Sequence, residues 1–141
     1  HAIGARIPRV CPRCPRTRKQ LGTFGLGERL NTGAGITLTE PLTYLAVMRL
    51  VSAARLVSTD AGGIQEETTD LDVPCMTLRE NTERPITLTE GTNRLVEPDD
   101  LLGGVEQVLS GDWPSGVRPE FWDGQTAARV AASLKHALGV A

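Results

Sequence analysis

The sequence has no apolar run of membrane-spanning length and no excess of charge of either sign. A membrane-spanning helix needs about 20 consecutive, mostly apolar residues, and no stretch of this chain approaches that length. Fifteen Lys and Arg residues against 17 Asp and Glu residues give a formal net charge of -2, which provides no electrostatic basis for binding nucleic acid. We therefore expect neither a membrane nor a nucleic acid as a partner.

Cysteine and histidine are also scarce, with three and two residues respectively. Cys11 and Cys14 form a CxxC pair, which can be half of a zinc site, but no second pair accompanies it. We therefore expect no metal ion, and the prolines beside the pair argue against an ordered redox dithiol. Cys75 lies in an apolar run and is expected to be a buried core residue. Three cysteines without a secretion signal favour a reducing, cytoplasmic compartment.

The chain has the size and composition of one globular domain. Its 141 residues leave no room for two nucleotide-binding lobes, and 40% hydrophobic and 23% charged residues are ordinary values for such a domain. The first residue is His1 instead of methionine, and the residues that follow do not resemble a signal peptide. We therefore expect a truncated N-terminus.

Short β-type runs alternate with longer amphipathic segments along the chain. The predicted helices are 16–24, 44–54, one starting at 63, 98–109 and 124–138, and the predicted strands are 35–38, 55–58, 75–78 and 94–96. In the helix at 44–54, Leu45, Met48 and Val51 recur at the spacing of one buried face. Alternating strands and helices predict βαβ units, and so an α/β fold with a Rossmann-like parallel sheet.

Residues 58–70 are the most informative segment. An apolar run ends at Ser58, and Gly62 and Gly63 follow the turn, where backbone can closely approach a bulky anion. A helix that begins there directs its free N–H groups and the positive end of its dipole at that anion. Glu66 and Glu67 come next and could accept hydrogen bonds from hydroxyls. An ordinary strand-to-helix turn with acidic residues near its start explains the same spacing.

The loop at 79–85 is the second segment with chemical character. It contains two arginines, two carboxylates, an amide and a hydroxyl directly after the predicted strand at 75–78. Ligands of a parallel sheet bind beyond the carboxyl ends of its strands, and the guanidinium group of arginine suits phosphate. A simpler interpretation is that Arg79 and Glu83, four residues apart, form an ion pair on a surface turn.

Several ordered blocks carry a resemblance to a known family. They are TDAGGIQEE at 59–67, VPCMTLRENTERP at 73–85, EGTNRLV at 90–96 and WDGQTAARV at 122–130, preceded by PRTRKQL at 15–21 and EPLTYL at 40–45. Together they resemble the non-hydrolysing UDP-N-acetylglucosamine 2-epimerases, and they match only the C-terminal half of such an enzyme. The resemblance implies the C-terminal nucleotide-binding lobe of a two-lobed, GT-B-type protein.

The resemblance also implies a binding site for a UDP-sugar. Ala61, Gly62 and Gly63 would contact the diphosphate, Glu67 would hold the nucleotide sugar and Arg84 would contribute to substrate binding. In the segment that lines the uridine pocket, the family's functional positions match Leu42 and Val47, whereas Tyr44 is interpreted as a packing residue. No cofactor is implied.

The activity implied is inversion at C2 of UDP-N-acetylglucosamine, by elimination of UDP and its re-addition. The catalytic carboxylates of the family lie N-terminal to this segment, so we expect no catalytic residue here and no activity from the chain alone. A missing N-terminal lobe is the implied partner, with a homodimer in the full enzyme. Two alternatives stay open: the C-terminal lobe of a GT-B glycosyltransferase, and a degenerate, non-enzymatic fragment.

Three features depart from the family pattern. Ala61 stands where the family commonly has serine, which removes one hydroxyl donor to phosphate and, at about 1 to 3 kcal/mol, weakens binding without abolishing it. Cys14 stands where the family usually has histidine. Residues 1–14 fit poorly, because Pro8, Pro12 and Pro15 would remove ladder donors where a strand is needed. We therefore divide the chain into an atypical, poorly ordered segment at 1–14 and a UDP-sugar-binding lobe at 15–141.

Overall fold

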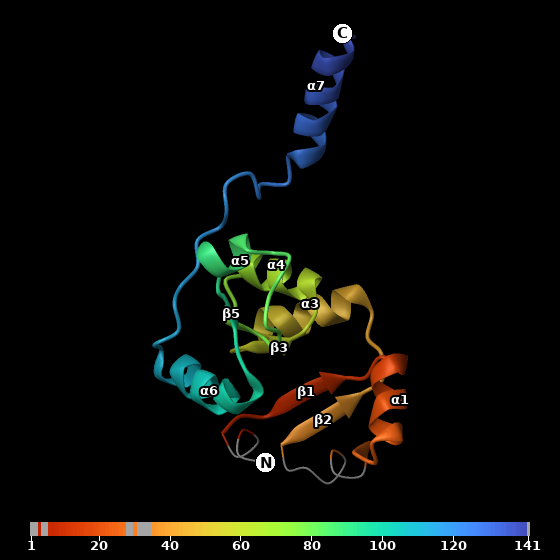
Figure 1. The fold of residues 1–141 in the computed structure, drawn as a ribbon, viewed down its shortest axis with the longest axis vertical. Coiled ribbons are helices and arrows are strands. Elements are labelled where there is room, and N and C mark those ends of the chain that lie inside the picture. Colours follow the sequence, from red (N-terminus) through yellow and green to blue (C-terminus); the bar gives the residue numbers. More distant parts are fainter. Residues whose placement is uncertain (1–2, 4–5, 28–29, 31–34, 141) are drawn as a thin grey trace.

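The computed structural model describes residues 3, 6–27, 30 and 35–140 (Figure 1). Its elements are β1 (Arg9–Pro12), α1 (Pro15–Thr23), β2 (Ile36–Thr39), α3 (Tyr44–Ala53), β3 (Val57–Thr59), α4 (Gly62–Asp70), β4 (Cys75–Thr77), α5 (Ile86–Thr89), β5 (Asn93–Leu95), the 3₁₀ turn η2 (Pro98–Asp100), α6 (Leu101–Ser110) and α7 (Thr126–Leu138). Every strand pair among these residues is parallel. The α/β class is confirmed, and each helix and strand predicted from residue 16 onward has an observed counterpart.

The strands pair as two parallel sheets instead of the one that the sequence predicted. One sheet contains β1 and β2, and the other has the order β3–β4–β5. In Figure 1, β1 and β2 lie side by side next to α1, while β3 and β5 lie with α4 and α5. Pro8 lies just before β1 and Pro12 is its last residue, and neither has an N–H to donate, which limits how far this strand can extend.

The strand β1 differs from the expectation for residues 1–14. Arg9 pairs with Ile36, and the ladder is extended by hydrogen bonds from Arg9 N to Gly35 O (2.8 Å) and from Arg13 N to Thr39 O (3.1 Å). The prolines fall just before the strand and at its last residue, so they leave the donors between them intact. Residues 1–2 and 4–5 of the segment lie outside the described residues.

Helix boundaries follow local chemistry. Thr43 caps α3, because its hydroxyl accepts the N–H of Ala46 at 3.4 Å. Gly111 ends α6 and Gly139 ends α7, each in the left-handed conformation that glycine adopts without strain (φ 86° and 64°). These three helix ends therefore lie where residue type favours them.

The buried core lies around β4. Met76 is fully buried and packs against Val105 and Val108 of α6. Partly buried side chains complete the cluster: Ile3, Ile7, Leu56, Val96, Leu101, Leu109 and Trp113. All three residues of β4 are buried, as is typical of a strand covered on both faces. Truncating a core methionine to alanine costs about 2 to 5 kcal/mol, so Met76 is a main support of the sheet that positions the glycine turn.

The predicted buried face of α3 is only partly correct. Val51 is buried and Met48 is half-buried, but Leu45 is 73% exposed. Leu45 lies in the first turn of α3, where it lines an open hollow with Glu67 and Leu71 of the neighbouring segment. The regular spacing was a correct sign of a helix, but it did not show how much of the helix is covered.

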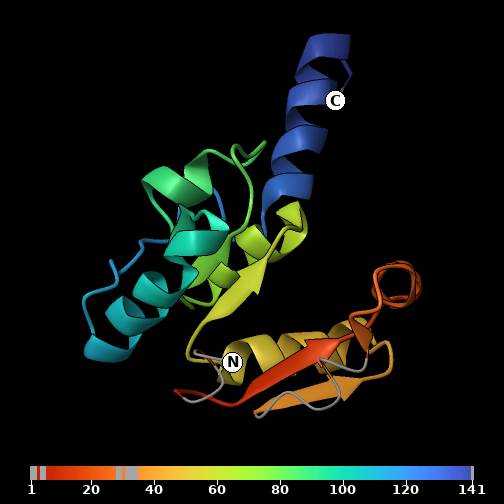
Figure 2. The ribbon, with the colours of Figure 1, turned by 60° about the horizontal axis from the view of Figure 1, so that its bottom comes forward.

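Helix α7 extends away from the other elements (Figures 1 and 2). Every residue of Thr126–Leu138 is exposed, including Val130, Leu134 and Leu138 at intervals of four. The segment that leads to it is tied to the domain by Arg118, which pairs with Asp70 at 2.6 Å. None of the helices in the described ranges is long and apolar enough to cross a membrane.

Candidate functional site

The glycine turn connects β3 to α4 as the sequence predicted. Ala61 occupies the N-cap position in an extended conformation, and its side chain makes no capping hydrogen bond. Its own N–H donates to the Thr59 hydroxyl at 3.0 Å, which fixes the turn. The first four N–H groups of an α-helix have no partner within the helix. The start of α4 therefore has donors and the positive end of a dipole for an anion.

The two glycines face different surroundings. A Cβ on Gly62 would lie 3.4 Å from Glu83 Oε1 and 4.0 Å from Arg84 Cγ, so Gly62 faces the loop at 79–85. A Cβ on Gly63 would meet nothing within 4 Å. Gly63 thus leaves open space in front of the helix start, where a ligand can approach the backbone.

That open space is part of a shallow hollow of about 300 Å³ between α3 and α4. It is lined by Leu42, Tyr44, Val47, Met48, Ala61, Gly63, Ile64 and Glu67. Three of the five predicted site residues, Ala61, Gly63 and Glu67, line this hollow, whereas Gly62 and Arg84 do not. The hollow also includes both residues that the family resemblance marked in the uridine pocket.

Glu67 makes a contact that the sequence did not predict. The Tyr44 hydroxyl donates to Glu67 Oε1 at 2.7 Å, and this bond is the main reason why the pKa of Tyr44 is raised above its usual value. The two residues are 23 positions apart, and no local pattern links them. The interpretation of Tyr44 as a packing residue is contradicted by its 63% exposure.

Arg84 lies on the other side of the turn and is paired within the protein. Its Nε is 2.9 Å from Glu66 Oε1, an ion pair without the direction of a good hydrogen bond. The expected ion pair between Arg79 and Glu83 on this loop is confirmed, because Arg79 Nη1 donates to Glu83 Oε2 at 2.9 Å. A hydrogen bond from its own backbone and the positive charge of Arg79 hold the pKa of Glu83 below its usual value.

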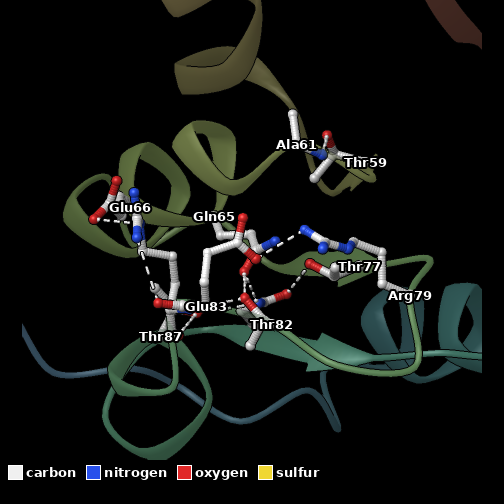
Figure 3. A network of polar contacts seen from close by, with 11 residues as sticks. Thr59, Ala61, Gln65, Glu66, Thr77, Arg79, Thr82, Glu83 and Thr87 are labelled. Carbon is white, nitrogen blue, oxygen red and sulfur yellow. Dashed lines mark hydrogen bonds and ion pairs between the residues drawn. The ribbon is translucent and has the colours of Figure 1, made fainter.

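A buried polar network fixes this loop against α4 (Figure 3). Gln65 is fully buried, and its Oε1 accepts from the Thr82 hydroxyl at 2.6 Å and from Asn93 Nδ2 at 3.2 Å. Asn93 also accepts from the Thr77 hydroxyl at 2.7 Å and donates to that of Thr87 at 3.1 Å. A buried polar group without a partner costs free energy. Moving the loop would break the bond between Thr82 and Gln65, so the network holds the loop in place.

Thr82 extends the network to Arg84. Its hydroxyl accepts the backbone N–H of Arg84 at 3.0 Å, two residues along the loop. Sequence reasoning missed Gln65, Thr82 and Asn93, because each lies in a mainly polar or glycine-rich stretch where no local pattern indicates that they would meet. Together these three residues hold the loop that carries Arg84 at a fixed place beside the glycine turn.

The cysteines and acidic residues that the structure describes do not gather into a metal site. Within residues 3, 6–27, 30 and 35–140, no three His, Cys, Asp or Glu side chains are placed to hold a metal ion. Cys14 caps α1 and accepts from Thr17, whose hydroxyl lies 3.0 Å from Sγ and lowers the pKa of this exposed thiol. Cys75 is buried, which raises the pKa of its thiol.

Comparison with relatives of known sequence gives a consistent result. UDP-N-acetylglucosamine 2-epimerase from Methanococcus maripaludis is 46% identical over 102 residues, which is 71% of this chain and 28% of that protein. The enzyme from Methanocaldococcus jannaschii is 39% identical over 126 residues, which is 86% of this chain and 33% of that protein. The chain therefore spans about a third of the length of these relatives.

Solved structures agree with the sequences. The M. jannaschii epimerase in complex with UDP-GlcNAc and UDP superposes with a TM-score of 0.79 and 38% identity over 90% of this chain and 35% of that one. The Neisseria meningitidis epimerase bound to UDP-GlcNAc superposes with a TM-score of 0.69 and 27% identity, over 89% of this chain and 36% of that one. The family model described as UDP-N-acetylglucosamine 2-epimerase matches residues 1–135. With nearly its whole length matched, the chain belongs to the UDP-N-acetylglucosamine 2-epimerase family.

Proposed function

We propose that this chain is the C-terminal nucleotide-sugar-binding part of a UDP-N-acetylglucosamine 2-epimerase and that its hollow holds the UDP portion of the substrate. The observation that carries the proposal is the lining of one hollow by apolar Leu42 and Val47, by the turn at Ala61 and Gly63, and by the carboxylate of Glu67. A nucleoside diphosphate needs an apolar surface for its base, hydrogen-bond acceptors for its ribose and N–H donors for its phosphates, and the hollow has all three.

Each part of UDP has a proposed partner. The uracil ring packs between the apolar side chains of Leu42 and Val47. The diphosphate lies at the start of α4, where Gly63 leaves open space beside the backbone and the helix dipole favours negative charge. The ribose hydroxyls donate to Glu67.

Arg84 requires an exchange of partners before it can bind phosphate. Its guanidinium group is paired with Glu66, beside Gly62. A diphosphate bound at the turn carries more charge than one carboxylate and attracts the guanidinium toward it. Arginine and helix N–H groups would then stabilise the negative charge that develops on UDP as it leaves C1 of the sugar.

The residues named above are proposed to bind the leaving group, UDP, and none of them is proposed to transfer a proton. The chain spans about a third of the relatives it matches, and we propose that the acid and base groups at C2 and C3 belong to an N-terminal lobe in a longer form. The exposed apolar side chains of α7 give such a form a further contact surface. We also propose that the full enzyme is cytoplasmic and dimeric, and that the chain alone does not epimerise UDP-N-acetylglucosamine.

Titration of the chain with UDP in a calorimeter tests the proposal. We expect weak but saturable binding, weakened about tenfold by Arg84→Ala, because a hydrogen bond to a charged group contributes about 1.5 to 3 kcal/mol. Arg79→Ala is the matched control, since it removes the same charge from the same loop but from the Glu83 pair. Absence of UDP binding would support the degenerate-fragment alternative instead.

A further inference from the structure

Tyr44 and Glu67 connect the two helices that enclose the hollow. Tyr44 is the first residue of α3, directly after the capping residue Thr43, and Glu67 lies in the second turn of α4. The phenol O–H reaches across and donates to Glu67 Oε1 at 2.7 Å. The side chain proposed to hold the ribose is therefore restrained by a specific partner on the opposite wall.

Packing does not account for this contact. Tyr44 is 63% exposed, so its hydroxyl could donate to water at no cost. A hydrogen bond to a carboxylate is charge-assisted and stronger than one between neutral groups. Because the contact is not imposed by burial, its effect is on the direction in which the Glu67 carboxylate points.

The direction matters because Glu67 borders two hollows. The smaller one contains the glycine turn. The larger one, of about 660 Å³, contains Arg49 but no residue of the turn. An unrestrained carboxylate would be free to turn into this larger hollow, which Arg49 and Asp70 both line, and away from the glycine turn. Tyr44 lines both hollows and holds the carboxylate at the boundary between them.

We propose that Tyr44 is a positioning residue for nucleotide recognition, which fixes Glu67 so that its carboxylate accepts the ribose hydroxyls of a nucleoside diphosphate. This inference rests on the proposed function of the same site. A carboxylate has roughly four acceptor positions, and Tyr44 uses one of them, so two ribose hydroxyls can bind at the same time. Because Tyr44 already fixes the Glu67 side chain, UDP binding has to meet less of the entropic cost of ordering it.

The test compares two ligands on the full 141-residue chain. UDP has both ribose hydroxyls, and 2′,3′-dideoxy-UDP has neither while keeping the base and the diphosphate. We expect Tyr44→Phe to weaken UDP about fivefold and to leave the dideoxy ligand unchanged. Leu45→Ala is the control, because it changes the next exposed side chain of α3 without touching the contact, and it should leave both affinities unchanged.

A double-mutant comparison separates positioning from a general loss of structure. Glu67→Ala, which removes the acceptor altogether, should weaken UDP, and adding Tyr44→Phe to it should weaken UDP no further, since the phenol acts only through the side chain of residue 67. Equal weakening of both ligands by Tyr44→Phe would show a structural role and overturn the inference. So would unchanged UDP binding in Tyr44→Phe.

A ligand-free measurement tests the contact itself. Tyr44 is the one tyrosine of the chain, so ultraviolet titration of phenol absorbance reports this residue alone. Glu67→Gln should lower the pKa of the phenol toward its ordinary value, and an unchanged titration would overturn the inference. If the wild-type chain fails to bind UDP, the proposed function fails and the inference with it. If UDP binds but Tyr44→Phe has no effect, only the inference fails.

Discussion

Arg84 Nε lies 2.9 Å from Glu66 Oε1, so the arginine that we propose to bind substrate already has a partner inside the protein. Both side chains are about two-fifths exposed, at 41% and 42%. Ion pairs this accessible contribute about 0 to 1 kcal/mol. The pair is therefore weak enough for a phosphate to displace it, yet it would compete with the phosphate that we propose to bind Arg84.

Removing the Glu66 carboxylate, which would compete with phosphate for Arg84, should tighten UDP binding. We expect Glu66→Gln to tighten UDP binding about two- to fivefold, since it removes an interaction of up to about 1 kcal/mol that the ligand has to displace. Asp70→Asn is the matched control, because it removes one carboxylate from the same helix where the partner is Arg118. Equal tightening in both variants would show a general charge effect and no competition for Arg84.

The N-cap of α4 offers a test with two separate readouts. We expect Ala61→Ser to raise the free energy of unfolding by about 0.5 to 2 kcal/mol, because Ala61 makes no capping bond and serine would supply one. If the diphosphate lies on this turn, the hydroxyl should also tighten UDP binding by about 1 kcal/mol, or about fivefold. Greater stability with unchanged affinity would place the diphosphate away from Ala61.

The polar network around Gln65 should be necessary for stability. We expect Thr82→Val to lower the free energy of unfolding by about 1 to 3 kcal/mol in urea denaturation, because it removes a donor to the fully buried Gln65 and an acceptor for Arg84 N–H. Thr89→Val is the control, since that hydroxyl is exposed and bonds only to carbonyls of its own helical turn. Similar losses in both variants would show that the network has no special role.

The cysteines should differ in reactivity. Hydrogen bonding from Thr17 lowers the pKa of the exposed Cys14 thiol, so its thiolate persists at lower pH than that of an ordinary cysteine. Cys75 is buried, which raises its pKa. Alkylation by iodoacetamide, followed by mass spectrometry, should modify Cys14 first, and Thr17→Val should shift the pH dependence of that reaction upward. Modification of Cys75 before Cys14 in the folded chain would contradict the structure.

The glycine turn could be predicted from the sequence because its signals are local. An apolar run, two adjacent glycines and an acid-rich segment specify strand, turn and helix without reference to the remainder of the chain, and the structure has them at Val57–Thr59 and Gly62–Asp70. The core position of Cys75 followed for the same reason. The Arg79–Glu83 pair was also foreseen, because four residues separate its members.

The contacts that the sequence did not reveal are long-range. Tyr44 meets Glu67 across 23 positions, and Asn93 meets Gln65 across 28. Nothing in local spacing indicates which distant polar groups will meet, because that depends on how α3, α4 and β5 pack. The exposure of Leu45 escaped prediction for a similar reason, since a helical stripe does not report how much of it a neighbour covers.

The central claim is that a nucleoside diphosphate binds at the start of α4, and Gly63→Val tests it most directly. A Cβ at Gly63 meets nothing in the protein but enters the hollow. Gly103→Val in α6 is the matched control, since a Cβ there also meets nothing within 4 Å. In calorimetric titration, we predict that Gly63→Val weakens UDP binding by about tenfold or more, while Gly103→Val binds like the wild type. UDP binding that is unchanged by Gly63→Val would contradict the account.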